Sequence, residues 1–281
     1  AKAPAACKDG IELVAYDLYT AVINTTQNGY GDGAPTVPPA AQDSKFATLS
    51  RPYGWANIDP RKSYQRLFNG EIVPSGNPEL IFSRGNTGID EMVNHQLPKN
   101  DGAWNCHGLT QKMVDAYYMN DGMDTPGKDR EIGRNTDGTK RLSGFTIEQD
   151  IRDGKYPELG GVKSANISGK SDNDKKIGIG ISLQYVNREP RFYASVAYSG
   201  TTWSYTSQEE DANSKARVNT QAFYYFGGAD GYRNDGFYLR TGIGIKKFVH
   251  PYDYPGKYKT KAETALRYAD ILLLYAEALT N

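Results

Sequence analysis

Cysteine and histidine are scarce in this 281-residue chain, and with them the usual ligands of transition-metal sites. The two cysteines, Cys7 and Cys106, make neither a disulfide framework nor the paired C-x-x-C of a zinc site. The sequence leaves open whether they bond to each other. The three histidines, at positions 95, 107 and 250, lie far apart, and no H-E-x-x-H is present. We therefore expect no metal ion and no cofactor.

An excess of charge of one sign is absent as well. Lys and Arg number 33, and so do Asp and Glu, which gives a formal net charge of zero at pH 7. Proteins that bind nucleic acid need a basic field to offset the phosphates. We therefore expect no nucleic-acid partner. The length allows one large domain or two small ones with a buried core.

A hydrophobic run long enough to cross a membrane is also lacking. The most apolar stretch, ALRYADILLLYAEALTN (265–281), consists of good helix formers without Gly or Pro. Its charges, Arg267, Asp270 and Glu277, share one narrow stripe of a helix. A membrane span takes about 20 apolar residues, and Asp270 near the middle would be costly there. The pattern instead predicts an interior helix that neighbours touch on most sides.

This helix is followed by neither a capping Gly nor a polar tail. We interpret the chain as a fragment whose further partner helices are missing. Such a fragment is expected to expose an apolar patch around Leu266, Leu273 and Tyr275.

Catalytic motifs are missing too. SGKS (168–171) ends like a phosphate-binding loop, but Ser164 stands where its first Gly belongs. IGIGIS and TGIGIK lack the third Gly of a dinucleotide turn, and no G-x-S-x-G occurs. A glycosidase would use two carboxylates, but nothing in the spacing of the 33 acids marks a pair. We expect no catalytic residue.

The periodicity of apolar residues predicts helices at both ends of the chain and short strands between them. Helices are predicted over 9–24, over 60–69 starting at Pro60, over 109–122 with Thr110 as N-cap, and over 262–281. Strands are predicted over 78–82, 176–186, 188–200 after a turn at Pro190, 221–226 and 236–248. Residues 25–261 as a whole are interpreted as a loop-rich region with short strands.

Aromatic residues are plentiful, with 21 Tyr and three Trp beside 30 Gly. Rings carried on loops suit wet binding surfaces. The candidate ligand-binding residues are those in loop-like stretches: Trp203 with Tyr205, Tyr53 with Trp55, and Trp104. The alternative is that these rings pack beneath loops as part of the scaffold.

Four blocks occur in a fixed order: NPELIFS (77–83), LTQKMVDAYYMNDG (109–122), NREPRFYASVAYSG (187–200) and ALRYADILLLYAEAL (265–279). Together they resemble the SusD/RagB family, the surface nutrient-binding lipoproteins of Bacteroidetes. Glu189 stands where the family more often has Asp. Each block alone is a weak signal, whereas four in order are a strong one.

The resemblance implies a mainly α fold of tetratricopeptide-type helix pairs with long loops and a few short β-strands. Residues 1–281 would form part of one domain, about half of a full-length member, and 262–281 a helix of its scaffold. The lipidated cysteine and signal peptide would lie upstream. Arg267 and Asp270 are spaced to pair along a helix, and the arginines of the REPR block are expected to hold loops on helices.

The resemblance also implies a function. Family members capture glycans, or in some cases peptides, at the extracellular face of the outer membrane and pass them to a SusC-like TonB-dependent transporter. A flat aromatic ring covers the C–H face of a sugar, and polar side chains bind its hydroxyls. Such binding needs no proton transfer, so we expect no enzyme. A peptide-binding member and, less favoured, a glycoside hydrolase are the alternatives.

Overall fold

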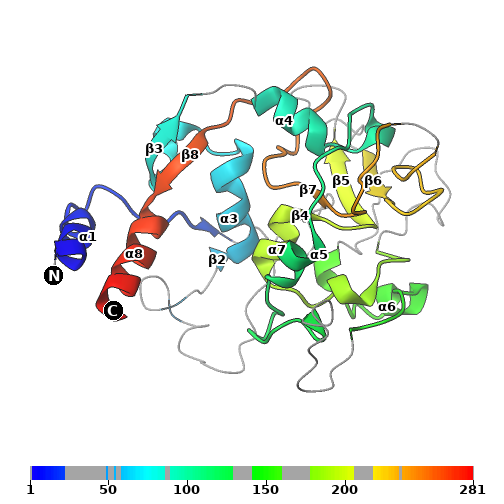
Figure 1. Cartoon of the computed structure of the whole chain (residues 1–281), viewed down its shortest axis with the longest axis horizontal. Helices are drawn as coiled ribbons and strands as arrows, with labels where there is room; N and C mark the ends of the chain where they lie inside the picture. The colour runs from blue at the N-terminus through cyan, green and yellow to red at the C-terminus, as the bar shows by residue number, and fades with distance from the viewer. Residues whose placement is uncertain are drawn as a thin grey trace.

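The computed structural model describes residues 2–22, 49, 54, 58–85, 89–128, 141–159, 178–205, 218–233 and 236–280. Within these, helices and loops predominate over short strands, as expected for a mainly α, SusD-like fold (Figure 1). The α-helices are α1 (Lys2–Glu12), α3 (Pro60–Asn69), α4 (Ile89–Gln96), α5 (Gln111–Asp115), α6 (Glu148–Arg152), α7 (Pro190–Ser195) and α8 (Tyr268–Thr280). Single 3-10 turns are Pro74–Gly76, Lys99–Asp101, Pro157–Leu159 and Leu183–Tyr185.

The strands pair two by two, and each pair is antiparallel. The pairs are β1 (Ala21–Val22) with β2 (Ile58–Asp59), β3 (Leu80–Arg84) with β8 (Glu263–Arg267), β4 (Val196–Ala197) with β7 (Gly244–Ile245), and β5 (Thr201–Tyr205) with β6 (Val218–Ala222). Most pairs join segments far apart in the sequence. The described strands therefore connect distant segments of the chain two at a time and do not form an extended sheet.

Helix α3 follows its predicted limits because three local signals agree. Pro60 occupies the first turn, where its missing N–H does no harm. The Asp59 carboxylate accepts a hydrogen bond from Lys62 N at 3.0 Å and caps the start. Gly70, with φ of 88°, ends the helix in the left-handed conformation. Thr110 likewise caps α5 as predicted, through a bond from Met113 N.

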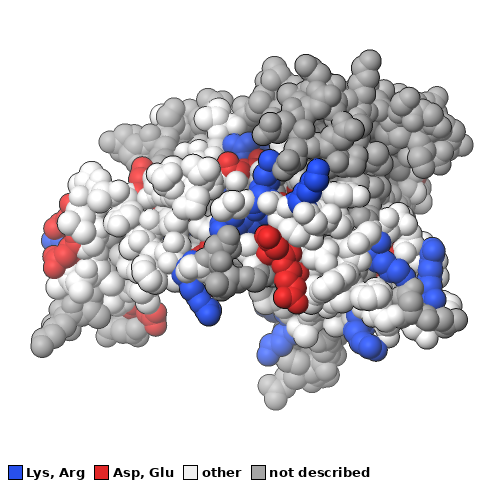
Figure 2. Space-filling model, turned by 90° about the horizontal axis from the view of Figure 1, so that it is seen from above, with Lys and Arg blue, Asp and Glu red and all other residues white. Residues whose placement is uncertain are grey.

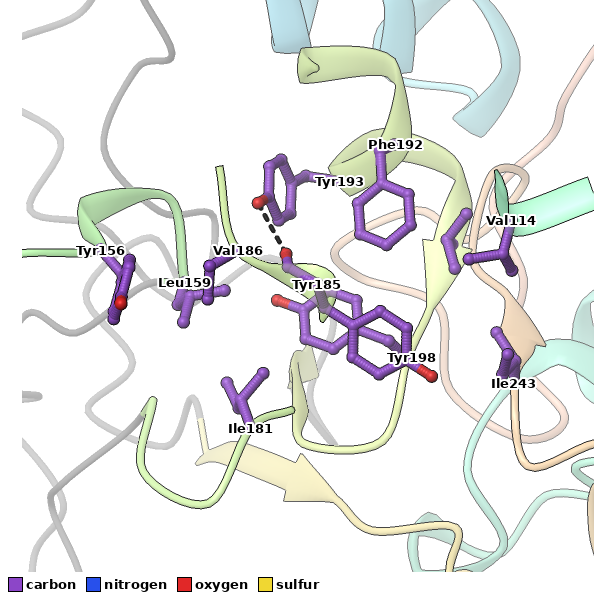
Figure 3. Packing of buried hydrophobic residues seen from close by; sticks show 11 residues of the cluster. Val114, Tyr156, Leu159, Ile181, Tyr185, Val186, Phe192, Tyr193, Tyr198 and Ile243 are labelled. Atoms are coloured by element: carbon purple, nitrogen blue, oxygen red, sulfur yellow. Dashed lines mark hydrogen bonds between the residues drawn. The ribbon is translucent and has the colours of Figure 1, made fainter. Parts of the chain in front are cut away.

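An aromatic core surrounds α7 (Figure 3). The rings of Tyr185 and Phe192 both stack on Tyr198, with centroids 5.1 and 5.7 Å apart. The Tyr193 hydroxyl donates to Tyr185 O at 2.7 Å, the bond drawn in Figure 3. A buried Tyr hydroxyl needs such a partner. This cluster holds the REPRF block at the centre of the molecule.

Arg188 connects that block to α5. Its guanidinium is buried and donates to Val114 O at 2.6 Å, Tyr117 O at 2.7 Å and Gln184 O at 3.2 Å. The same group lies 4.7 Å over the ring of Phe192. Burial lowers the pKa of Arg188. The REPR block therefore holds loops on helices as predicted, with carbonyl groups as the partners of this arginine.

Several predicted elements end elsewhere. Over 9–24 the helix stops at Glu12, because Val14 adopts φ of 53° and the chain continues extended, with Asp17 N donating to Pro78 O. The strand predicted over 176–186 is not formed over its described part, 178–186. Gly178 and Gly180, both at positive φ, introduce turns there. Pro190 begins a helix, so 188–200 contains α7 before the short strand β4. Of 236–248 only β7 is a strand.

The closing helix begins at Tyr268, and not at 262. Residues Glu263–Arg267 form β8, which pairs with β3. Arg267 donates to the Glu79 carboxylate at 2.9 Å and lies 3.2 Å from that of Asp270, which confirms the predicted pairing along the chain. The Asp270 carboxylate also accepts from Arg267 N at 2.9 Å and so caps the helix start.

Helix α8 is not interior in this chain, contrary to the prediction from its composition. It lies beside α1 (Figure 1). The two helices are close enough that a Cβ atom added to Gly10 would lie 3.8 Å from Ile271 Cγ2. None of its residues is buried, and Leu273 is 68% exposed. The predicted exposed patch is therefore present at Leu273, whereas Leu266 and Tyr275 are half-buried. No described helix is long and apolar enough to cross a bilayer.

Candidate functional site

Three aromatic side chains contact one another on the loop that follows β6. The rings of Phe226 and Tyr232 lie 6.0 Å apart, and those of Tyr232 and Tyr238 lie 4.9 Å apart. Phe226 is 81% exposed and Tyr232 38% exposed. We call these three residues the aromatic platform; exposed Tyr225 and Phe237 adjoin it in sequence. Exposed large aromatics gathered in one place are typical of binding surfaces.

A glycine-dependent turn shapes the platform. Gly231 approaches the backbone so closely that a Cβ atom there would lie 1.8 Å from Tyr225 O, and a Cβ on Gly228 would lie 2.4 Å from Phe223 O. Gly228 N donates to Tyr225 O at 2.9 Å. Only glycine fits these two positions, because any side chain would collide with the backbone. The two glycines therefore allow the tight turn that brings the rings together.

Asp230 anchors this turn to a second segment. The residue is buried, and its carboxylate accepts from Asn100 N at 2.9 Å. Its backbone carbonyl accepts from Asn105 Nδ2 at 2.9 Å, and its N–H donates to Phe223 O. Burial raises the pKa of Asp230. The platform is thereby tied to residues 100–105, which include Trp104.

Of the two predicted site residues whose side chains the structure describes, Trp104 is accessible, at 41% exposure. Its ring packs against His95, with centroids 4.8 Å apart, and His95 in turn contacts His107 at 4.9 Å. Trp104 N donates to Asn94 O at 3.0 Å. Burial and the neighbouring His95 lower the pKa of His107. This ring is fixed on one side and open to solvent.

Trp203 lies in the core, with 4% exposure. Its Nε1 donates to the Tyr224 hydroxyl at 3.1 Å, and Lys246 Nζ lies 5.3 Å from the ring centre. Trp203 therefore packs in the core and holds Tyr224, a buried residue of the platform loop, through this hydrogen bond. Tyr205 ends β5, and its side chain lies outside the described residues, as do Tyr53 and Trp55.

Carboxylates with raised pKa values are candidates for acid–base chemistry. Burial raises the pKa of four: Glu79, Glu158, Asp230 and Asp253. Each binds a structural neighbour, namely the Arg267 guanidinium, Asn187 N–H, Asn100 N–H and the Lys261 ammonium, respectively. These bonds fix loops and strands, and they account for the environment of all four groups.

The part of the chain that the structure describes contains no group of three or more His, Cys, Asp or Glu placed to hold a metal ion. Cys7 and Cys106 are both free thiols. On the face shown in Figure 2, acidic and basic side chains are interspersed over a mostly uncharged surface.

The platform residues are not among the candidates predicted from the sequence, which were Trp residues and the Tyr residues beside them in loop-like stretches. The aromatic run FYYF (223–226) was interpreted as a strand, yet β6 ends at Ala222. The signal was present in the alternation of rings with GG, DG and Gly236 just downstream, a composition that is typical of turns. Only the structure shows that Tyr224 points into the core while Tyr225 and Phe226 are exposed.

Comparison with known proteins places the fold. The profile of the SusD family matches residues 78–281. The solved structure of selenomethionine BT4246 is similar with a TM-score of 0.54 at 18% identity, covering 98% of this chain and 42% of that one. A second BT4246 structure gives 0.52 at 20% identity, covering 99% of this chain and 42% of that one. A SusD-like protein (BF3747) from Bacteroides fragilis NCTC 9343 gives 0.43 at 20% identity, covering 78% and 35%.

No curated protein matches the chain. The chain spans about 42% of the length of the BT4246 structures. The family profile includes three of the four blocks on which the resemblance rested and all of the first except Asn77, and it covers well over half of the residues. That resemblance is confirmed: the chain belongs to the SusD family.

Proposed function

We propose that this chain is part of a nutrient-binding protein that captures oligosaccharides at the outer face of the outer membrane and passes them to a SusC-like TonB-dependent transporter. The aromatic platform is the proposed contact with the sugar. Binding takes place without bond cleavage, so the protein is proposed not to be an enzyme. Family membership supports the general role of nutrient binding.

The observation that carries the proposal is the aromatic platform, in which Phe226 and Tyr232 are exposed and Tyr238 is half-buried. Sugar rings present apolar C–H faces that stack on flat aromatic side chains, while Tyr hydroxyls bind the rim. A platform held by Gly228, Gly231 and Asp230 loses little conformational entropy when a ligand binds. This arrangement therefore favours capture by stacking.

Calorimetry with a panel of neutral and acidic oligosaccharides tests the platform. We expect Tyr232→Ala and Phe226→Ala each to weaken binding of the cognate glycan about fivefold, since each ring contributes on the order of 1 kcal/mol. Phe82→Ala is the matched control, because Phe82 is also an exposed aromatic but lies on β3. Unchanged affinity in both platform variants would exclude this surface as the site.

Trp104 is proposed as a second contact, since it is exposed and its neighbour Asn105 binds the platform loop through Asp230. Trp104→Ala should weaken longer oligosaccharides more than short ones, because only a longer ligand reaches both rings. Equal loss for all lengths would place Trp104 and the platform on the same subsite. No loss at any length would remove Trp104 from the site.

Two alternatives have direct tests. Heat on titration with peptides, and none with any glycan, would favour the peptide-binding branch of the family. Release of shorter products from oligosaccharides would favour a hydrolase. The proposed transfer of oligosaccharides to a SusC-like transporter is tested by co-purifying the full-length protein with a SusC-like transporter encoded beside it. A full-length protein that never associates with that transporter would contradict the proposed transfer.

A further inference from the structure

Arg240 lies beside the aromatic platform in an unusual setting for a surface arginine. Its guanidinium stacks over Tyr238, with the central carbon 4.9 Å from the ring centre, and Nη1 donates to the Tyr238 hydroxyl at 2.8 Å. Among the described residues it pairs with no carboxylate. An arginine carries five N–H donors, so most of those on Arg240 remain available.

The stacking also orients this cation. A guanidinium that lies on a ring and bonds to its hydroxyl has lost much of the rotamer freedom of a surface side chain. Its planar fork is thus held next to Tyr238, whose ring contacts that of Tyr232. A ligand stacked on the platform would meet a positioned cation.

A second cation, Arg233, follows Tyr232 directly in the sequence. It is exposed, and its Nε donates to Gly228 O at 2.9 Å, within the glycine turn. Its charge interacts with that of the buried Asp230 carboxylate, which accepts from Asn100 N–H. Arg240 is therefore the better candidate for an anionic ligand, because no described carboxylate pairs with it.

We propose, building on the function proposed above, that the platform binds oligosaccharides containing uronic acid, with Arg240 as the partner of the sugar carboxylate. A guanidinium matches a planar carboxylate through two parallel N–H···O bonds. The sugar ring stacks on the exposed rings of Phe226 and Tyr232, and its carboxylate meets Arg240, which lies over the neighbouring Tyr238. A neutral glycan would leave these donors without an anionic partner.

The test compares uronate oligosaccharides with their methyl esters, which keep the sugar ring and remove the charge. Calorimetry is carried out on galacturonate, glucuronate and mannuronate oligomers at low and at moderate salt. We expect the acid form of the cognate glycan to bind at least about tenfold more tightly than its ester at low salt, and this preference to shrink as salt screens the charge.

Arg240→Gln separates the charge from the platform. The variant should weaken binding of the acid about tenfold and leave binding of the ester unchanged. Arg84→Gln is the matched control, because Arg84 is an exposed arginine on β3. Thermal unfolding of each variant verifies that the fold is retained, which is expected because Arg240 is exposed.

Each result decides between the two proposals. If the acid and the ester bind equally well and Tyr232→Ala weakens the binding of both, the inference is overturned and the proposed function stands. Binding of sulfated glycans without binding of uronates would overturn the carboxylate as the ligand group. A panel without any bound glycan would overturn the proposed function, and the inference with it.

Discussion

Replacement of Arg188 by Met tests how the REPR block holds the fold. Met fills a similar volume but removes the cation and all of its donors. The bonds to Val114 O, Tyr117 O and Gln184 O are lost, as is the contact with the Phe192 ring. Two of these carbonyls keep a second donor: Tyr117 N lies 3.4 Å from Val114 O, and Thr125 Oγ1 lies 3.1 Å from Tyr117 O.

The expected loss of stability follows from these contacts. Hydrogen bonds from a charged donor contribute about 1.5–3 kcal/mol each, and a buried cation over a ring about 1 kcal/mol. At the low end the three bonds and the ring contact together amount to about 5.5 kcal/mol. Burying the guanidinium costs part of this, about 2 kcal/mol, which Met does not incur. The net destabilisation is therefore about 3.5 kcal/mol, or roughly 7–14 °C in Tm.

Thermal and urea unfolding followed by circular dichroism measure this loss, with Arg191→Met as the matched control. Arg191 belongs to the same block but is exposed, and among the described residues its ion pair is with Glu189, at 2.7 Å. Its replacement should cost less than about 1 kcal/mol. Amide exchange should quicken over α5 in the Arg188 variant only.

Equal and small effects of the two replacements would refute the reasoning. In that case the buried guanidinium would be no more stabilising than an apolar side chain of the same volume, as has been seen for some buried ion pairs. Loss of stability with unchanged exchange in α5 would mean that Arg188 acts through the aromatic core and not through the helix.

Three further predictions concern separate parts of the molecule. Burial raises the pKa of Glu158 above its unfolded value, so ionisation disfavours the folded state as pH rises. Glu158→Gln keeps an acceptor for Asn187 N, and its Tm relative to wild type should climb in calorimetry as the pH rises above about 4, the ordinary pKa of Glu. Gly231→Ala should lower Tm and abolish glycan binding, since its Cβ meets Tyr225 O, whereas Gly236→Ala, with open space around it, should change neither. Leu273→Lys, on the exposed face of α8, should reduce self-association in light scattering without lowering Tm.

Each of these has a contrary outcome. A Tm difference that is flat with pH would mean that the Glu158 carboxyl is solvated in the folded state. Alanine tolerated at 231 would show that the turn has room to relax. Unchanged light scattering in the Leu273 variant would show that the exposed leucines of α8 do not drive association.

Short-range signals in the sequence predicted several elements correctly. Asp59, Pro60 and Gly70 define α3 through capping and backbone preference, which act over one or two turns of chain. Thr110 begins α5 for the same reason. The four family blocks identified the fold class, because they carry the contacts on which that fold depends.

Elements that depend on distant partners were predicted poorly. Residues 263–267 favour helix locally, yet they form a strand because β3 offers hydrogen bonds and Glu79 binds Arg267. Trp203 and Trp104 both occur in loop-like sequence, but the first packs under Tyr224 and the second faces solvent. Burial is decided by what packs against a residue, and local sequence does not contain that information.

The sequence by itself determined the family, the neutral charge, the absence of recognisable catalytic motifs and the abundance of rings suited to stacking. Only the tertiary structure decided which rings are available. Phe226, Tyr232 and Tyr238 come together because two glycines allow a tight turn and buried Asp230 ties it to a distant segment. The bonds of Asp230 to Asn100 and Asn105 span more than a hundred residues, so their geometry arises only when the chain is folded.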